Sequence, residues 1–481
     1  MTKDVSEIDI VVSTVKRWLG NPISRFFLSW LSKRDEKEGS KLEKALRKYA
    51  FPEEGVKVNY LAWLVVKSTL DKGASSFGVP KERMIEALKS PIVRRGIANI
   101  LEGIGYWGVQ TPQTTAAPFL IVWNFTKMCN LRCKHCYENA GSYPAPDELT
   151  TEEAKRVIDE FKRVGVVAIA FSGGEPLMRK DFFEIARYAV ENDFYVSMAT
   201  NGTLITPRIA RKIKETGIEY VEISLDGFEK THDEFRGIKG AWRRAVEGIK
   251  NCVAEGIDTG VATTVTKYNL KEIPEFLEFV ERELHPKRFI AFNFVPTGRG
   301  KEIIKADLTP KEREELLNFL YGKLIDPNFH MDVLSTAPQY AVTSVNYFAG
   351  GPTMVTHFIN QEAAEMLKGK AKALAPFIGG CGAGRLYAAV EPNGDVLPCV
   401  FIPVKVGNLR KDKLDDIWRN SPILKKIRER NSFEGCGICP YKEICGGCRA
   451  RAYGYFRNLQ GPDPGCSINE KYWDELVKES E

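Results

Sequence analysis

The stretch Phe119-Leu-Ile-Val-Trp-Asn-Phe125 is an apolar run, and a cysteine loop, Cys129-Asn-Leu-Arg-Cys133-Lys-His-Cys136-Tyr137, follows it closely. The run predicts a buried strand that ends in a polar loop with three thiols. Three thiolates can hold three irons of a [4Fe–4S] cube and leave the fourth iron open to a substrate or cofactor. The alternative is zinc, whose closed sites take four ligands and would need His135. Because His135 directly precedes Cys136, the two side chains would struggle to reach one ion, and the loop favours a cluster.

The composition is that of a soluble globular protein with room for two or three domains. The chain has 481 residues, of which 43% are hydrophobic and 27% are charged, and both fractions are ordinary. The net charge of +6 is small for this length. Its mixed signs predict no nucleic-acid partner but are compatible with a carboxylate-bearing substrate or an anionic membrane surface. We expect neither a transmembrane helix nor a signal peptide, because no apolar run is long enough.

Cysteine usage predicts a reducing compartment. Ten of the eleven cysteines fall in metal-ligand spacings. Cluster ligands must be free thiolates, so we expect a cytoplasmic protein. The remaining one, Cys252, lies in a helical pattern and is expected to be a small buried core residue.

From residue 119 onward, strand and helix patterns alternate. The expected strands are Phe119–Phe125, Val167–Phe171, Phe194–Thr200, Glu219–Leu225, Asp258–Val265 and Arg288–Phe294. Helical patterns lie between them, and one begins with the capping box Thr150-Thr-Glu-Glu153. This alternation predicts an α/β fold with a parallel sheet and crossover helices. Six units are too few for a closed eight-stranded barrel, so the expected architecture is an open six-stranded (β/α)6 partial TIM barrel.

The residues that carry chemistry follow the ends of these strands. After the cysteine loop come Gly173-Gly174-Glu175-Pro176, Thr200-Asn201-Gly202, Ser224-Leu225-Asp226-Gly227 and Pro296-Thr-Gly-Arg299-Gly300. In (β/α) barrels the active site is assembled from loops at the carboxyl ends of the strands. The order of the motifs along the chain therefore predicts an active site at this rim.

Together these motifs resemble the radical SAM superfamily, whose signature is Cys-x3-Cys-x2-Cys followed by an aromatic residue. The resemblance implies that S-adenosylmethionine (SAM) binds the open iron of a cluster ligated by Cys129, Cys133 and Cys136. It also implies reductive cleavage of SAM to a 5′-deoxyadenosyl radical, which removes a hydrogen atom from a substrate. An electron donor such as a ferredoxin or a flavodoxin is then an expected partner.

Further residues are expected to contact SAM: Tyr137, Gly173, Gly174, Glu175, Asn201, Ser224 and Arg236. The resemblance implies that Glu175 accepts from the ammonium group of SAM. It places Asn201 and Ser224 at the ribose and carboxylate of SAM, and Tyr137 beside adenine. Arg236 could hold the carboxylate through its guanidinium fork, with a solvated arginine as the alternative. The two glycines would let the backbone approach a ligand closely.

A second group of cysteines lies near the C-terminus: Cys381, Cys399, Cys436, Cys439, Cys445, Cys448 and Cys466. Two zinc sites would need eight ligands, and no histidine lies in this region. The pattern resembles the SPASM domain, which carries auxiliary [4Fe–4S] clusters in many radical SAM enzymes. We therefore expect SAM, a SAM-binding [4Fe–4S] cluster and two auxiliary [4Fe–4S] clusters as cofactors.

The SPASM resemblance implies how these seven cysteines are divided. Auxiliary cluster I would be ligated by Cys381, Cys399 and Cys448. Auxiliary cluster II would be ligated by Cys436, Cys439, Cys445 and Cys466. Cluster I would then lack one protein thiolate, and its open iron could contact the substrate directly.

Four segments are expected: a helical N-terminal extension (1–111), the radical SAM partial barrel (112–325), a linker region (326–380) and the cysteine-rich SPASM domain (381–481). The expected helices outside the barrel are Val5–Leu19, Ile23–Leu31, Lys41–Tyr49, Asn59–Leu70, Lys81–Leu88, Pro91–Ile104 and Gln361–Leu374. Residues 1–35 mix apolar and aromatic residues with Lys and Arg. They form either a peripheral membrane contact or a hairpin packed on the catalytic domain, and we favour packing.

Three substrate classes stay open. Asn293–Glu302 and Cys445–Tyr453 resemble the branch that forms heme and heme d1, which acts on propionate side chains of a tetrapyrrole. Arginines that could bind such carboxylates are Arg299, Arg385, Arg449 and Arg451. A membrane lipid would suit the basic, aromatic extension, and a ribosomal peptide is the third option. Sulfatase maturation is disfavoured, because Val400 stands where an aspartate is expected after the second SPASM cysteine. A non-catalytic iron–sulfur electron carrier would need the C-terminal cysteines but not Glu175 or the rim motifs.

Overall fold

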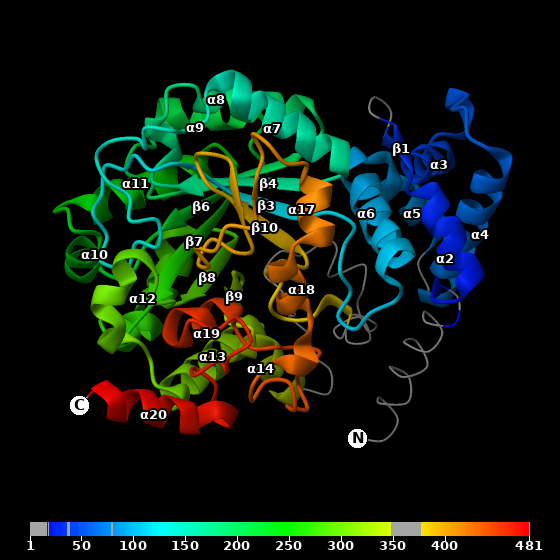
Figure 1. The fold of residues 1–481 in the computed structure, drawn as a ribbon. Coiled ribbons are helices and arrows are strands. Elements are labelled where there is room, and N and C mark those ends of the chain that lie inside the picture. The colour runs from blue at the N-terminus through cyan, green and yellow to red at the C-terminus, as the bar shows by residue number, and fades with distance from the viewer. Residues whose placement is uncertain (1–16, 18, 36–38, 78–79, 348–376, 481) are drawn as a thin grey trace.

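The computed structural model of the protein describes residues 17, 19–35, 39–77, 80–347 and 377–480. The predicted helix Gln361–Leu374 and nearly all of the predicted helix Val5–Leu19 lie outside these residues. The described part consists of an α/β body and a group of N-terminal helices beside it (Figure 1).

A ten-stranded sheet forms the centre of the α/β body. Its middle consists of parallel strands that are hydrogen-bonded in chain order: β3 (Leu120–Thr126), β4 (Ala168–Gly173), β5 (Tyr195–Thr200), β6 (Tyr220–Ser224), β7 (Asp258–Val265) and β8 (Arg288–Asn293). These strands confirm the predicted α/β class, the six predicted strands and their parallel order.

The sheet is wider than the six predicted strands. β9 (Asp332–Ser335) pairs in parallel with β8, and β10 (Tyr387–Val390) pairs in parallel with β3. β11 (Asp395–Leu397) and β12 (Gly407–Asn408) extend it further as antiparallel strands. β12 and β9 are its two edges, so the sheet stays open. Both the expected linker region and the cysteine-rich segment therefore contribute strands to the barrel sheet.

Helices cover the outer face of the parallel strands (Figure 1). They are α7 (Thr151–Val164), α8 (Phe182–Glu191), α9 (Pro207–Thr216), α10 (Glu229–Arg236), α11 (Ala241–Ala254), α12 (Ile273–Phe279) and the π-helix η4 (Val280–Leu284). The predicted capping box starts α7, because Thr150 Oγ1 accepts from the Glu153 amide at 3.2 Å and Glu153 Oε2 accepts from the Thr150 amide at 2.9 Å. Cys252 is fully buried in the core under these helices, as predicted.

Further helices complete the α/β body. They are η2 (Pro176–Met178), η3 (Leu270–Glu272), η5 (Gly298–Ala306), α13 (Pro310–Leu324), α14 (Gln339–Tyr347), α17 (Leu414–Asn420), α18 (Pro422–Arg428), η6 (Arg430–Ser432), α19 (Arg449–Phe456), η7 (Ser467–Asn469) and α20 (Glu470–Ser480). Among the described residues, no helix is long and apolar enough to cross a membrane.

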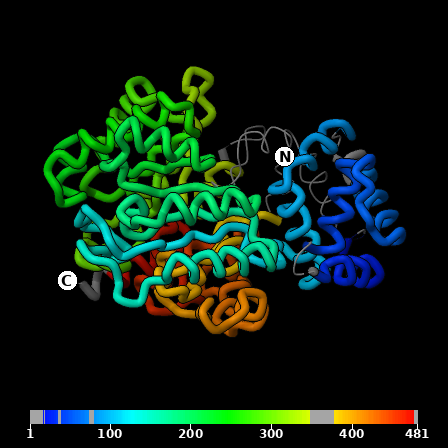
Figure 2. The backbone as a smooth tube through the Cα atoms, turned by 90° about the horizontal axis from the view of Figure 1, so that it is seen from above, coloured from blue at the N-terminus to red at the C-terminus, as the bar shows by residue number. Residues whose placement is uncertain are grey.

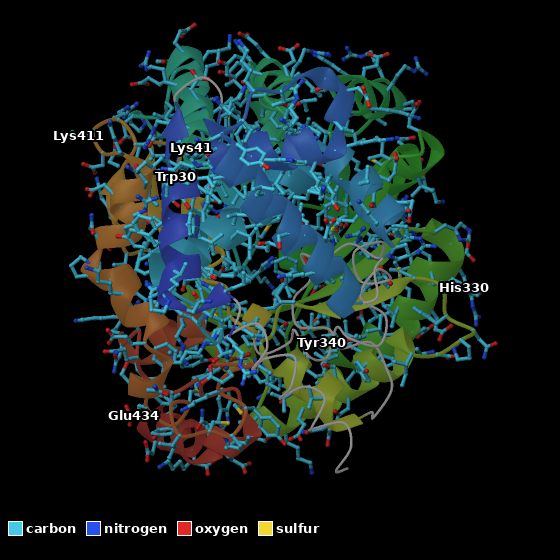
Figure 3. The ribbon with its side chains drawn as sticks, turned by 90° about the vertical axis from the view of Figure 1, so that its right-hand side faces the viewer. Trp30, Lys41, His330, Tyr340, Lys411 and Glu434 are labelled. Atoms are coloured by element: carbon cyan, nitrogen blue, oxygen red, sulfur yellow. The ribbon has the colours of Figure 1, made fainter. Side chains whose placement is uncertain are left out.

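The N-terminal helices confirm five of the predicted ones. They are α2 (Pro22–Leu31), α3 (Lys41–Ala50), α4 (Tyr60–Phe77), α5 (Lys81–Lys89) and α6 (Pro91–Trp107), with η1 (Pro52–Glu54) and the short strands β1 (Arg34–Asp35) and β2 (Gly39–Ser40). Figure 2 shows them to one side of the α/β body. They share a small core of their own, and at its margin the Lys41 Nζ lies 4.2 Å from the centre of the Trp30 ring (Figure 3).

Helix α6 fixes this group to the α/β body. Arg95 donates to the carbonyl oxygens of Asp193 (3.1 Å) and Asn192 (3.2 Å), and Asn99 donates to that of Gly165 (3.0 Å). Helix α2 packs along α6 and buries Leu28 and Leu31. Its Ile23 and Phe26 remain 71% and 70% exposed, so a membrane contact of this segment stays a prediction.

Candidate active site

The three cysteines of the first loop lie together at the carboxyl end of β3. They pack in one small cluster of side chains: Cys129, Cys133, Cys136, Leu131 and Ala241. The Lys134 amide donates to the carbonyl of Phe235 at 2.9 Å, and the Arg299 amide donates to the carbonyl of Cys136 at 3.0 Å. The loops that follow three different strands therefore meet at the cysteines, as expected for the rim of a (β/α) barrel.

The donor set of this loop fits an iron–sulfur cluster. Burial is the main cause that raises the pKa of Cys129, to about 12, and it raises the pKa of Cys133 as well. Binding of iron to these thiols releases their protons. Among the described residues, no three histidine, cysteine or carboxylate side chains are arranged to hold a single metal ion. Thiolates that bind separate irons of a cube stand further apart than the four ligands of one zinc ion.

Gly173 and Gly174 bring the second loop against the cysteine loop. Gly173 has a φ of +108°, and a Cβ atom on Gly174 would lie 2.2 Å from the carbonyl oxygen of Met128. The Gly174 amide donates to the carbonyl of Thr126 at 2.7 Å, and the Glu175 amide donates to that of Met128 at 2.8 Å. The two glycines thus let the second loop lie close to the backbone of residues 124–128, just before Cys129.

Glu175 is fully buried and held by three hydrogen bonds. Its carboxylate accepts from Thr200 Oγ1 (2.8 Å) and from the amides of Asn201 (2.8 Å) and Leu177 (3.2 Å). Burial raises its pKa to about 7, while these hydrogen bonds act in the opposite direction. A carboxylate has about four acceptor positions, so one remains for a cationic group.

Asn201 and Ser224 lie on the neighbouring rim loops. The Asn201 side-chain amide donates to Asn130 Oδ1 at 2.8 Å, and the same nitrogen is 4.0 Å from Cys129 Sγ. Ser224 ends β6 in register with Ala262, and it alternates with the core residue Ile223. Ser224 therefore lies on the side of the sheet that faces away from the helical core, and Asn201 lies beside the cysteine loop.

Arg236 connects the cysteine loop to a buried aspartate. Its Nη1 is 3.6 Å from Cys133 Sγ, and its Nε donates to Asp226 Oδ2 at 2.6 Å. Asp226 is fully buried, and its other oxygen accepts from the Thr264 amide at 2.8 Å. Asp226 therefore orders the loop after β6. Arg236 donates a hydrogen bond toward Cys133 Sγ, and Asp226 neutralises the charge of this arginine.

Tyr137 forms a contact between the first loop and the C-terminal domain. Its hydroxyl donates to Asn124 Oδ1 at 3.0 Å and lies 2.9 Å from Ser172 Oγ. Its ring packs edge-on against Phe401, with ring centroids 5.0 Å apart. Because Tyr137 follows Cys136 directly and Phe401 comes two residues after Cys399, this contact joins two cysteine groups.

A polar network beside Tyr137 was not predicted. Lys127 forms ion pairs with Glu138 and Glu391, the second at 3.0 Å. Asn124 donates to both carboxylates, at 2.5 and 2.8 Å. Burial, with Glu391 next in size, raises the pKa of Glu138 to about 8. The sequence signal was Asn124 itself, a polar residue inside the apolar run that forms β3.

Three C-terminal cysteines share one side-chain cluster near Phe401: Cys381, Cys399 and Cys448. The Tyr387 hydroxyl donates to Cys399 Sγ at 2.7 Å, and the Phe401 amide is 3.5 Å from the same sulfur. Burial raises the pKa of Cys399 to about 12. The group that the SPASM resemblance assigns to auxiliary cluster I is therefore brought together.

The other four cysteines line a pocket of their own. They are Cys436, Cys439, Cys445 and Cys466. Asn469 Nδ2 is 3.3 Å from Cys436 Sγ, and the Gly447 amide is 3.4 Å from Cys445 Sγ. This is the group that the resemblance assigns to auxiliary cluster II, and nitrogen donors face its sulfurs as they do in the first loop.

The arginines considered for substrate carboxylates are used within the protein. Arg451 is fully buried and forms ion pairs with Asp307 (2.6 Å) and Asp463 (3.1 Å). Arg385 and Arg449 are also buried and donate to backbone carbonyls. Arg299, which is partly exposed, donates to the carbonyls of Cys133 and Ala140. The prediction is wrong for Arg385, Arg449 and Arg451, because their guanidinium groups are buried and donate to groups within the protein, out of reach of a substrate carboxylate.

Two family models match the chain at these sites. Residues 123–280 match the model described as the radical SAM superfamily, and residues 381–449 match the SPASM model, described as an iron–sulfur cluster-binding domain. The first match spans the cysteine loop and the rim motifs after β4, β5 and β6, and it ends at Val280, where η4 begins. The motif Pro296–Gly300 lies beyond it. The second contains six of the seven C-terminal cysteines, and Cys466 lies beyond it.

Relatives and solved structures agree with these matches. An AdoMet-dependent heme synthase of Methanosarcina barkeri is 37% identical over 73% of this chain and 97% of its own length. A mycofactocin maturase of Mycobacterium tuberculosis is 32% identical over 73% of this chain and 83% of its own. The crystal structure of Streptococcus suis SuiB bound to S-adenosylmethionine has the same fold, with a TM-score of 0.60 and 19% identity over 90% of this chain and 96% of its own.

The cysteine groups, the rim loops and the identity to a whole-length relative lead to one assignment. The chain uses SAM with a [4Fe–4S] cluster, and its C-terminal domain binds auxiliary iron–sulfur clusters. This protein belongs to the radical SAM superfamily and is one of its enzymes with a SPASM domain.

Proposed function

We propose that this enzyme oxidatively modifies a tetrapyrrole by removing hydrogen from one of its propionate side chains. The observation that carries the proposal is the 37% identity to a heme synthase across 97% of that relative's length. The same archaeon has an Fe-coproporphyrin III synthase that is 33% identical over 73% of this chain.

The residues of this chain have defined parts in the proposal. Bound SAM supplies a 5′-deoxyadenosyl radical after one-electron reduction. Glu175 accepts from the SAM ammonium group, since its three internal hydrogen bonds fix the carboxylate in place. The Tyr137 ring packs against Phe401. This contact keeps the proposed SAM site next to the cysteines of auxiliary cluster I.

The N-terminal helices favour a second candidate, a membrane lipid. Ile23 and Phe26 of α2 are exposed, and Arg25 lies between them in the sequence. A ribosomal peptide is a third candidate, because a mycofactocin maturase is 32% identical to this chain. Recognition of propionates has to come from basic residues other than Arg385, Arg449 and Arg451.

Substrate-dependent release of 5′-deoxyadenosine tests the proposal. The anaerobically reconstituted protein is given SAM, a reductant and one of three additions: iron coproporphyrin III, anionic lipid vesicles or a short peptide. We expect release above background in the first case. Each converted propionate should give one hydrogen atom to the 5′-deoxyadenosyl radical, carbon dioxide, and one electron that an auxiliary cluster accepts, so the porphyrin loses the mass of a carboxyl group and one hydrogen. Stimulation by vesicles or peptide alone would overturn the tetrapyrrole assignment in favour of that class.

A further inference from the structure

The C-terminal domain contains three buried arginines that form no ion pair with a carboxylate among the described residues. Arg385, Arg430 and Arg449 are 4%, 7% and 1% exposed. The neighbouring Arg451 is equally buried but is paired with two aspartates. A buried charge is stable only when it is paired and hydrogen-bonded. One guanidinium nitrogen has no hydrogen-bond partner in Arg385 (Nε) and also in Arg451 (Nη2), so the difference between them is the missing carboxylate.

All three guanidinium groups lie against cysteines. Arg385 Nη2 and Arg430 Nη2 donate to the same carbonyl oxygen, that of Cys381, at 3.4 and 3.3 Å. Arg449 Nη2 is 3.6 Å from Cys436 Sγ. One pair therefore lies beside the first C-terminal cysteine group, and Arg449 lies beside the second.

The Cys445-Gly-Gly-Cys448 segment makes room for these charges. A Cβ atom on Gly446 would lie 2.7 Å from the Arg430 Cζ. A Cβ atom on Gly447 would lie 2.6 Å from the Arg449 Nη2 and 2.7 Å from Cys436 Sγ. Both glycines also have a positive φ, at 72° and 64°, which other residues rarely adopt. Because these two positions carry no side chain, Arg430 lies against Gly446, and both Arg449 and Cys436 lie against Gly447.

The missing countercharge is of the kind that an iron–sulfur cluster supplies. A cubane together with its cysteine thiolates is an anion, and nearby positive charge and hydrogen bonds to sulfur raise its reduction potential. At the SAM-binding loop the situation differs, because Arg236 is already neutralised by Asp226 at 2.6 Å. The carboxylate of Glu443 is near Arg430 but forms no ion pair with it, and Arg430 donates instead to the Glu443 carbonyl at 2.9 Å.

We propose that Arg385, Arg430 and Arg449 are the countercharges of the two auxiliary clusters and raise their reduction potentials above that of the SAM-binding cluster. The auxiliary clusters are then the better electron acceptors within the chain. The proposal rests on the cofactors of the family and does not depend on which substrate the enzyme takes.

A redox titration followed by electron paramagnetic resonance tests this without substrate. In the reconstituted full-length protein, Arg449→Gln should make reduction of auxiliary cluster II at least about tenfold less favourable, about 59 mV for a one-electron couple. Arg430→Gln should do the same for cluster I. Arg449→Lys keeps the charge and should restore most of the potential.

The matched control is Arg95→Gln in α6. Arg95 is also buried and donates to backbone carbonyls, but it lies in the N-terminal helices, so its loss should leave all three potentials unchanged. Unchanged auxiliary potentials in Arg430→Gln and Arg449→Gln, with full iron content, would overturn the proposal. A second measurement uses the unsubstituted protein, so it does not depend on the folding of a variant: it compares the reduction potentials of the three clusters. Auxiliary clusters that are reduced only below the potential of the SAM-binding cluster would also overturn it.

Discussion

At the scale of single residues, the active-site rim is held by hydrogen bonds between loops. Glu175 ties the second loop to the third through Thr200 and Asn201. Asn201 in turn reaches Asn130 in the cysteine loop. A substitution at Glu175 therefore changes both the proposed SAM contact and the loops around it, and its effect on each has to be measured separately.

Glu175→Gln should weaken SAM binding by about 10- to 100-fold. The substitution removes a hydrogen bond between charged groups, which contributes about 1.5–3 kcal/mol. Calorimetric titration of the reconstituted protein with SAM measures the affinity, and iron content shows whether the cluster is intact. Glu215→Gln on the exposed face of α9 is the control. Unaltered SAM affinity would refute the proposed role of Glu175.

Cys399→Ala should separate SAM cleavage from product formation. Cys399 lies in the group assigned to auxiliary cluster I, whereas Cys129, Cys133 and Cys136 are the proposed ligands of the cluster that cleaves SAM. We expect 5′-deoxyadenosine to form at a rate close to that of the unaltered protein, while product from the tetrapyrrole is lost. Both yields are measured in one anaerobic assay. If product still forms with unaltered coupling, cluster I takes no part in the substrate chemistry.

Residue roles could be predicted from sequence where spacing carries the chemistry. The loops that follow separate strands, and the two groups of C-terminal cysteines, come together as the motifs indicated. The arginines show the limit of this reasoning. A sequence gives no sign that Arg385 and Arg449 are buried and donate to carbonyls such as those of Gln113 and Gly461, because those partners are set by tertiary packing.

At the scale of elements, the α7 capping box also fixes a neighbouring loop. Glu153 accepts from Arg410, which follows β12, at 2.9 and 3.0 Å. Arg410 is the main cause that lowers the pKa of Glu153 from 4.5 to about 2. A carboxyl whose pKa is lower in the folded state stabilises that state above its unfolded pKa. The contribution of Glu153 is therefore full above pH 4.5 and is lost as the pH falls toward 2.

Glu153→Gln should accordingly speed amide exchange in the first turn of α7 and in the loop around Arg410. Hydrogen–deuterium exchange at pH 7 compares the variant with the unaltered protein, and the difference should narrow as the pH falls from about 4.5 to about 2. Glu191→Gln at the exposed end of α8 is the matched control. A difference that persists at pH 2 would show that the ion pair is not its cause.

The strands illustrate which elements a local pattern can reveal. The six central strands are apolar runs bounded by helices, so their sequence pattern was sufficient to predict them. β9 has four residues, and β10 pairs with β3 from the opposite end of the chain. Neither has an alternating pattern of useful length. β9 and β10 are positioned by hydrogen bonds to the free edges of β8 and β3. A sequence does not show which strand edges are free.

At the scale of the whole molecule, ten cysteines in three groups predict three cubes. Anaerobic reconstitution should bring the iron content to about twelve per chain. Joint replacement of Cys129, Cys133 and Cys136 by Ala should remove about a third of the iron and all SAM cleavage. Iron and sulfide analysis measures this, with Cys252→Ala as the control for loss of a buried thiol. Stoichiometric zinc with little iron would contradict the cluster assignment.

The pairing of β10 with β3 has a consequence for synthesis of the chain. Leu120 leaves the ribosome long before its partner Tyr387, a delay of roughly 10–50 s at usual rates of translation. During that interval one side of β3 has unpaired amide and carbonyl groups, which is a template for joining another strand. The nascent barrel must therefore be shielded until β10, about four-fifths of the way along the chain, has been made. Fragments that end before β10 should aggregate, however complete their SAM-binding motifs are.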